Sequence, residues 1–380
     1  MTKRKMALVL QGGGALGAYE YGVVTKLVEM DWEPVAVSGV SIGAVNAAAI
    51  AGAKGGDIAA SLKAVWERIT MKAVPFVPAN MQANFSLFGN PNFWQSRTNC
   101  LEMASWTSLC DTTPMYATLA QNIDFDQINR AGADGLPAVR LAVTATSLET
   151  GGPMTFSNYL HATGADAGTD ATGQCTEKLN AVKQTIRAEH IMASGALPPG
   201  FPPVMIDDCA YWDGGLFSNT PIDALLNLLT EDEYDTLPIF TIDLFATNNL
   251  PVPKNLLEVQ TRALAMQYEN RFWAAFGGSA GLEGFLGMLA RLEAELPKDS
   301  VLRQGGAGNL EAAAWNWLKR MRALKNIHVI QGAPAPSGGD HDFSPYAVEA
   351  AYQAGRTAAR NVVKIGESGS RKPLPLRAVA

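Results

Sequence analysis

A glycine-rich turn follows each of the first two apolar runs of this 380-residue chain, and a helical pattern follows each turn. The first run is Met6–Leu10, and its turn is Gly12–Gly17. The second run covers 35–39 and leads through Gly39–Gly43 into an Ala-rich helical stretch. Two consecutive strand–turn–helix units predict an α/β fold, in which helices cover a mainly parallel sheet.

The rest of the chain continues this mixture of strand and helix patterns. Further strands are expected at 139–146, 237–245 and 326–332, and a helix is expected at 178–193. From residue 255 the pattern is mainly helical, and the tail from Glu367 is rich in Pro and Ser. We therefore expect a mostly helical second part, with one or two strands, and a mobile end.

Composition excludes several classes of function. Charged residues make up 17% of the chain and the formal net charge is −6, so neither a disordered chain nor a nucleic-acid partner is expected. The four cysteines show no C-x-x-C spacing, which argues against a zinc site or a redox motif and favours a reduced, cytoplasmic protein. No stretch approaches the ~20 apolar residues of a membrane span, so any membrane contact should be peripheral. The oligomeric state is not predicted.

Ser41 is the candidate nucleophile. It is the centre of a G-x-S-x-G motif, Gly39–Gly43, which lies between a strand pattern and a helical pattern, as a nucleophile elbow requires. The glycines leave room for a sharp turn, and the N-terminus of the next helix favours developing negative charge. The same spacing recurs at Gly277–Gly281, but that copy follows a helical stretch, so we interpret it as a linker.

The turn Gly12–Gly17 has more than one interpretation. As G-x-G-x-x-G it would bind a nicotinamide or flavin dinucleotide, but the second strand lacks the acidic residue needed at its end. A turn required only for close packing of strand and helix is a second interpretation. We favour a third, in which the backbone N–H groups of Gly12, Gly13 and Gly14 lie beside Ser41 as an oxyanion hole.

A serine nucleophile needs a base, and two candidates stand out. His341, in a loop after the last strand, suits a Ser-Asp-His triad. The other histidines are at 161, 190 and 328, and they fit structural or exposed positions better. Asp213 is the stronger candidate, because two glycines follow it and would let its carboxylate approach Ser41. Its pKa would have to rise through partial burial beside Trp212 for it to act near neutral pH.

Together, these motifs resemble those of the patatin-like phospholipase family. The resemblance rests on Gly12–Gly17, Gly39–Gly43 and Asp213–Gly215 in that order. Three shorter stretches agree with it: Ala193-Ser194 before Ala196-Leu197-Pro198, Phe201-Pro202, and Asn219-Thr220-Pro221. One position departs from the family pattern, because Leu16 stands where a basic residue usually precedes the last glycine of the first motif.

The resemblance implies a three-layer α/β/α fold and a serine acyl hydrolase without metal or cofactor. The hydrolase domain would cover 6–226, the C-terminal extension 227–366 and the mobile tail 367–380. The implied site consists of a catalytic dyad, an oxyanion hole and supporting glycines: Ser41 and Asp213; Gly12, Gly13 and Gly14; Gly17, Gly39, Gly43, Gly214 and Gly215.

The expected substrate is a lipid ester or phospholipid, with an acyl groove lined by the aromatic and Met-rich insertion at 76–106. Leu16 favours less charged esters. Two alternatives remain open: a Ser-Asp-His esterase that uses His341, and a lipid-binding scaffold that keeps the fold without turnover.

Overall fold

The structure is a computed structural model that describes residues 3–82, 89–159, 181–245, 252–270, 272, 276, 279–303, 310–332 and 339–367. The expected tail beyond residue 367 and part of the second G-x-S-x-G copy lie outside these ranges. Every helix in the described part of the chain is too short or too polar to span a bilayer.

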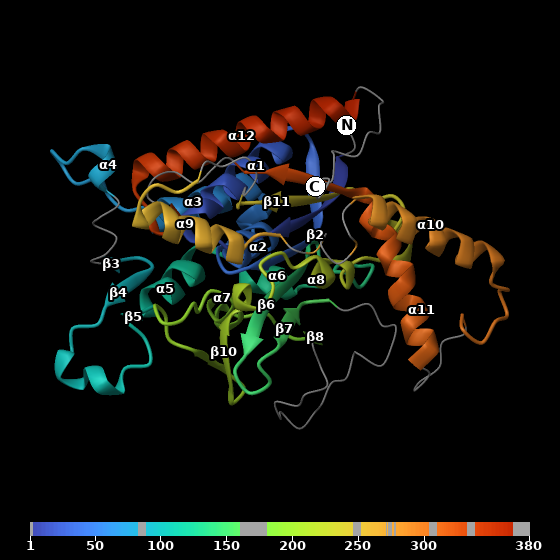
Figure 1. Cartoon of the computed structure of the whole chain (residues 1–380), viewed down its shortest axis with the longest axis horizontal. Helices are drawn as coiled ribbons and strands as arrows, with labels where there is room; N and C mark the ends of the chain where they lie inside the picture. Colours follow the sequence, from blue (N-terminus) through green and yellow to red (C-terminus); the bar gives the residue numbers. More distant parts are fainter. Residues whose placement is uncertain are drawn as a thin grey trace.

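A mostly parallel sheet forms the centre of the molecule (Figure 1). In its described part, the strand order is β12-β11-β1-β2-β6-β10-β9, with β7 beside β6 and β8 beside β7. The strands are β1 (Arg4–Leu10), β2 (Trp32–Val40), β6 (Arg140–Ser147), β7 (Pro153–Ser157), β8 (Ala181–Lys183), β9 (Val204–Ile206), β10 (Cys209–Asp213), β11 (Ile239–Asp243) and β12 (Ile327–Gln331). A small separate sheet contains β3 (Gly89–Asn90), β4 (Trp94–Ser96) and β5 (Cys110–Asp111).

Helices cover both faces of the large sheet. The helices of the described residues are α1 (Ala18–Glu29), α2 (Ile42–Ala51), α3 (Ile58–Ile69), α4 (Ala79–Gln82), α5 (Thr113–Asn122), α6 (Phe125–Asn129), α7 (Ala188–Ser194), α8 (Ile222–Leu226), α9 (Leu256–Gln267), α10 (Ser279–Glu295), α11 (Leu310–Met321) and α12 (Pro345–Glu367). The prediction of a helix at 178–193 is wrong in its first half. Residues 181–183 form β8, which pairs with β7, and the helix α7 begins only at Ala188.

The side chains of β1 explain the three layers. Met6, Leu8 and Leu10 belong to the core beneath α1, α2 and α3, whereas Ala7 and Val9 belong to the core beneath α8, α10 and α11. All five are fully buried, as expected for a central parallel strand with helices on both faces. The predicted α/β/α architecture is therefore confirmed.

The functional edge of the sheet is created by two strands that meet end to end along β6. Strand β2 runs parallel to β6 and finishes with Val40 opposite Thr144. Strand β10 runs antiparallel and finishes with Asp213 opposite Ala145, the next residue of β6. Ser41, which follows Val40, therefore lies beside the end of β10.

The C-terminal part completes the sheet and one helical layer. Strands β11 and β12 extend the sheet beyond β1, and α12 packs along α1 (Figure 1). The two helices approach closely, because a Cβ at Gly22 would lie 2.0 Å from the Tyr352 carbonyl oxygen and one at Gly355 would lie 2.1 Å from that of Tyr19. The domain boundary expected after residue 226 stays a prediction, because strands from both sides of it belong to one sheet.

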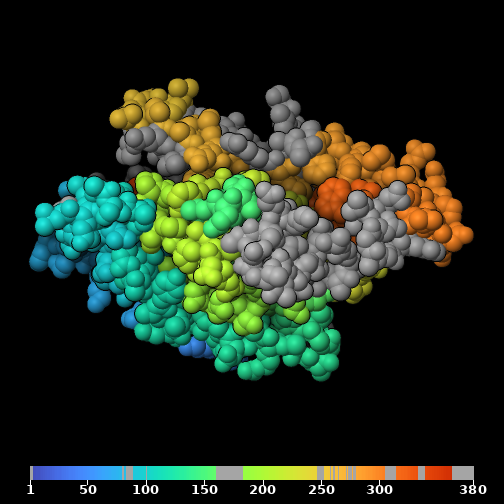
Figure 2. All heavy atoms as spheres, turned by 90° about the horizontal axis from the view of Figure 1, so that it is seen from below, coloured from blue at the N-terminus to red at the C-terminus, as the bar shows by residue number. Residues whose placement is uncertain are grey.

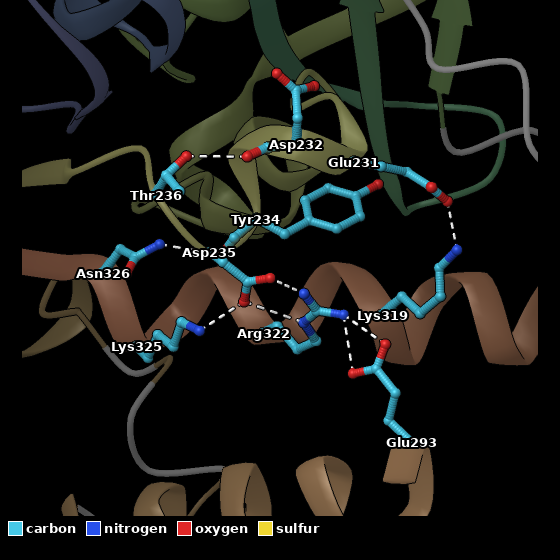
Figure 3. Close-up of polar contacts among 10 residues, drawn as sticks. All are labelled: Glu231, Asp232, Tyr234, Asp235, Thr236, Glu293, Lys319, Arg322, Lys325 and Asn326. Carbon is cyan, nitrogen blue, oxygen red and sulfur yellow. Dashed lines mark hydrogen bonds and ion pairs between the residues drawn. The ribbon is translucent and has the colours of Figure 1, made fainter. Parts of the chain in front are cut away.

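A network of ion pairs fastens the C-terminal helices to the loop at 231–236 (Figure 3). Asp235 pairs with both Arg322 and Lys325, and Arg322 also pairs with Glu293 of α10. At the other end of the loop, Glu231 pairs with Lys319 of α11. Because Asp235 is shared by two cations, it is the centre of this contact.

We expect Asp235→Asn to lower the free energy of unfolding by about 1 kcal/mol, since these side chains are partly exposed and such pairs are weak. Thermal unfolding at low and high salt would measure it, and the effect should shrink at about 1 M salt, where charges are screened. Glu67→Gln, in an exposed pair with Lys63, is the matched control and should change little. An equal loss in both variants would contradict the network.

One cysteine departs from the expected reduced chain. Cys209, at the start of β10, is disulfide-bonded, whereas Cys110 is free. The expectation of four reduced thiols is therefore wrong at Cys209, and the cysteine pattern no longer supports a cytoplasmic location, because such bonds persist in oxidising compartments.

Thiol titration of the denatured, unreduced protein tests this bond directly. Four cysteines less one bonded pair leaves two, so we expect two reactive thiols before reduction and four after it. Four reactive thiols before reduction would contradict the disulfide.

Candidate active site

Ser41 occupies the sharp turn between β2 and α2, with a left-handed φ of 54°. Both flanking glycines of its motif are sterically required. A Cβ at Gly39 would lie 2.3 Å from the Gly43 carbonyl oxygen, and a Cβ at Gly43 would lie 2.5 Å from the Leu10 carbonyl oxygen. The G-x-S-x-G spacing thus reflects close backbone packing around a serine in a strained conformation, which is typical of functional positions.

Ser194 at the end of α7 holds this turn in place. Its hydroxyl accepts a hydrogen bond from the Ser41 N–H at 2.9 Å and donates one to the Thr144 carbonyl oxygen at 2.6 Å. The Ser194 carbonyl oxygen also accepts from the Ser41 N–H, at 3.1 Å. The turn is therefore tied to β6 through a single buried serine.

Asp213 meets Ser41 where β10 ends. Its side chain is 3% exposed, and it accepts a hydrogen bond from the Gly215 N–H at 2.7 Å. Burial raises the pKa of Asp213 to about 6, while side-chain hydrogen bonding with Ser41 and the bond from Gly215 oppose that rise. Gly214 allows this approach, because a Cβ there would lie 2.2 Å from the Thr144 carbonyl oxygen.

The glycine loop lies directly beside Ser41. The register of β1 against β2 pairs Leu10 with Gly39, so both turns leave the sheet at one edge. A Cβ at Gly12 would lie 3.0 Å from Ser41 Cβ. The last glycine of the motif, Gly17, packs on α2, where a Cβ would lie 2.7 Å from Ile42 Cγ1.

The N–H groups of this loop differ in what they bind. Gly12 N–H donates to Asn219 Oδ1 at 3.1 Å, and Asn219 Nδ2 donates back to the Gly12 carbonyl oxygen at 3.1 Å. Gly12 therefore does not offer the free donor that the sequence suggested. No hydrogen bond from the N–H of Gly13 or Gly14 occurs within the described residues, so these two remain as candidate oxyanion donors.

A buried polar network supports the loop from behind. Glu20 is fully buried and accepts hydrogen bonds from Gln11 N at 2.7 Å and from Asn46 Nδ2 at 2.9 Å. Trp66 Nε1 donates to Asn46 Oδ1 at 2.9 Å. Burial raises the pKa of Glu20 well above its usual range, so this carboxyl favours the neutral form.

Tyr268, which follows α9, is a site residue that sequence reasoning missed. Its carbonyl oxygen accepts from Asn219 Nδ2 at 3.1 Å, and a Cβ at Gly215 would lie 3.6 Å from its ring. Burial raises the pKa of Tyr268 to about 12, and the charges of Asp213 and Asp340 add to the rise. No local motif marks Tyr268, because only the tertiary fold brings it to the site.

His341 lies apart from this arrangement. It pairs with Asp340 at 3.5 Å, which raises the pKa of its imidazole, and its side chain is 56% exposed. Within the described residues, no hydrogen bond joins His341 to Ser41 or Asp213, so the triad alternative lacks its contacts.

The other histidines take structural positions or fall outside the described residues. His190 is buried, accepts from Arg187 N at 2.9 Å, and has its pKa lowered to about 4 by burial. Burial also lowers the pKa of His328 in β12. His161 lies outside the described ranges.

The described aromatic side chains of the insertion differ in their surroundings. Phe76 is fully exposed, whereas Phe93 and Trp94 pack with Phe201 and Phe343 in a closed ring cluster. Residues 83–88 of the insertion lie outside the described ranges, so the acyl groove expected there stays a prediction.

The alternative of dinucleotide binding meets a steric obstacle at Gly14. A Cβ at Gly14 would lie 2.1 Å from the Asp340 carbonyl oxygen, so backbone already fills the space against this glycine. Among the described residues, no group of three His, Cys, Asp or Glu side chains could hold a metal ion.

Comparison with known proteins agrees with these motifs. The family model described as patatin-like phospholipase matches residues 8–226, and the chain belongs to this family. The crystal structure of VipD from Legionella pneumophila is similar, with a TM-score of 0.36 and 14% sequence identity over 96% of this chain and 67% of VipD. No curated protein matches the sequence.

Proposed function

We propose that this protein is a serine acyl hydrolase that cleaves carboxylic esters of lipids with a Ser41–Asp213 dyad. The observation that carries the proposal is the contact between a serine on a strained strand-to-helix turn and a buried carboxylate whose pKa is raised to about 6. Family membership supports lipids as the substrate class.

In the proposed reaction, Ser41 Oγ attacks the ester carbonyl carbon and its proton passes to Asp213. The N–H groups of Gly13 and Gly14 hold the negative charge that develops on the carbonyl oxygen. Asp213 then gives the proton to the leaving alcohol, and an acyl-serine remains. Water attacks this acyl group, loses a proton to Asp213, and releases the fatty acid when Ser41 regains its proton.

The raised pKa of Asp213 is central to this proposal. A carboxylate with a pKa near 3.8 is a weak base at neutral pH, whereas one near 6 is a better proton acceptor and remains ionised there. Burial supplies the change, and the two following glycines let the carboxylate stay in contact with Ser41 while it is buried.

Leu16 suggests which lipids would be preferred. It is buried beside the glycine loop and brings no cation to the position where the family usually has one. We therefore propose a preference for neutral or zwitterionic esters over anionic phospholipids.

The test is hydrolysis of soluble acyl esters of graded chain length, together with one zwitterionic and one anionic diacyl phospholipid. We expect turnover of esters and a slower reaction with the anionic lipid. Faster cleavage of the anionic lipid would contradict the role given to Leu16. Lipid binding without any turnover would favour the scaffold alternative.

A further inference from the structure

Two exposed tips carry apolar side chains at one end of the molecule. The first tip, 72–82, bears Phe76 at 107% exposure and Met81 at 51%. The second tip, 97–109, bears Leu101 at 103%, Met103 at 60% and Leu109 at 57%. Exposed apolar side chains are common singly, but a group of them marks an interaction surface.

The backbone of the first tip holds Phe76 in an unusual conformation. Pro75 and Phe76 are the two turn residues, and Phe76 has a φ of 66°, in the left-handed region. Glycine or asparagine usually occupies such a turn position. The Phe76 ring gains no burial that would compensate for this conformation, so its presence points to a partner outside the chain.

Both tips are fixed at their bases. Gln82 closes the first tip by accepting a hydrogen bond from Val74 N at 3.0 Å and donating to the Val77 carbonyl oxygen at 2.9 Å. At the end of the second tip, Leu109 N donates to the Pro199 carbonyl oxygen at 3.0 Å. These bonds hold the apolar side chains outward and keep them from collapsing onto the core.

The second tip is also linked to the proposed catalytic site. The end of the second tip donates its hydrogen bonds to the segment 195–200. This segment begins beside the proposed nucleophile, because a Cβ at Gly195 would lie 4.0 Å from Ser41 Cα. Figures 1 and 2 show that α4 and the segment around residue 100 project at the end of the molecule opposite α10 and α11.

The shape and charge of the tips favour a lipid surface as their partner. The two tips project separately from the molecule. The acyl chains of a lipid bilayer can surround each tip and bury its exposed aromatic and aliphatic side chains. Their only charged residues are Lys72, Arg97 and Glu102, a net charge of +1, so little attraction to anionic headgroups is expected.

We propose that the tips at 72–82 and 97–109 insert into a bilayer of zwitterionic lipid, with Phe76 and Leu101 as the main anchors. The proposal rests on the proposed function, because it brings the catalytic edge of the sheet to the surface that contains its ester substrate. Burial of one large apolar side chain corresponds to about ten-fold or more in partitioning.

The test is flotation with phosphatidylcholine vesicles, using Ser41→Ala as the parent so that the lipid is not consumed. We expect Leu101→Ser and Phe76→Gly each to weaken partitioning about ten-fold or more. Val301→Ser removes a side chain of 66% exposure between α10 and α11 and is the matched control, which should change partitioning less than about two-fold.

Phe76→Gly also separates loss of the ring from loss of structure. Glycine accepts a φ of 66°, so this variant should unfold at the same or a higher temperature while it binds vesicles less well. Partitioning should vary little between roughly 0.05 M and about 1 M salt, because apolar insertion is not screened. A steep fall with salt would overturn the proposal, as would equal partitioning of the tip variants and Val301→Ser.

Hydrolysis of a soluble short-chain ester distinguishes failure of this inference from failure of the proposed function. With Ser41 restored, Phe76→Gly and Leu101→Ser should keep this activity. If the wild type lacks Ser41-dependent ester hydrolysis, the proposed function fails, whereas the flotation result still decides the docking surface. If no vesicle binding occurs while the ester is cleaved, only the docking surface is refuted.

Discussion

Ser41→Ala should lower kcat/KM for ester hydrolysis by about 10³-fold or more. The substitution removes the only oxygen that the proposed mechanism can acylate, and leaves just the modest catalysis of a binding site. The contacts that hold the turn remain, because the Ser41 N–H donates to the Ser194 hydroxyl, which donates in turn to the Thr144 carbonyl oxygen, and neither bond uses the Ser41 side chain. Initial rates with a soluble ester, at matched thermal stability, measure the effect.

Two variants control for this result. Ser279→Ala alters the second G-x-S-x-G copy at the start of α10, and His341→Ala removes the alternative base. Both should keep nearly full activity. A large loss in His341→Ala, with unchanged stability, would restore the triad alternative and contradict the dyad.

Asp213→Asn should lower kcat/KM by about 10²-fold or more and change its pH dependence. In the wild type, activity should rise with pH through about 6, where Asp213 becomes ionised, and level off above it. Asparagine cannot accept the proton, so the remaining activity of the variant should not rise with pH around 6. A variant that keeps the wild-type profile would show that another group supplies the base.

The same substitution should make the protein more stable at neutral pH. The pKa of Asp213 is raised from 3.8 to about 6 on folding, so the folded state binds more protons between these values and loses stability as pH rises across them. Above pH 6 the cost of the buried charge amounts to about 3 kcal/mol. Asp213→Asn removes it, so the melting temperature should rise at pH 8 and change little near pH 4.

The location of the proposed nucleophile follows from local sequence rules. The G-x-S-x-G spacing and its strand-to-helix context predict a turn that the structure contains, because close backbone contacts at Gly39 and Gly43 exclude side chains there. The chain order of the motifs also indicates the family, and the family model confirms it over residues 8–226.

Features that depend on tertiary packing were not predictable in this way. The loss of Gly12 as a donor results from Asn219, which is 207 residues away, and Tyr268 reaches Asp213 only through the segment after α9. The helical period at 178–193 was misleading, because pairing with β7 makes residues 181–183 a strand. Spacing alone did not reveal the disulfide at Cys209.

Reaction with a fluorophosphonate, followed by mass spectrometry of the digested protein, shows whether Ser41 is the activated nucleophile. Such a reagent forms a covalent bond with a serine that is activated for acyl transfer. We expect one label on Ser41, formed more slowly below pH 6, and none in Asp213→Asn over the same time. A label on Ser279, or ester hydrolysis that persists with Ser41 unlabelled, would contradict this expectation.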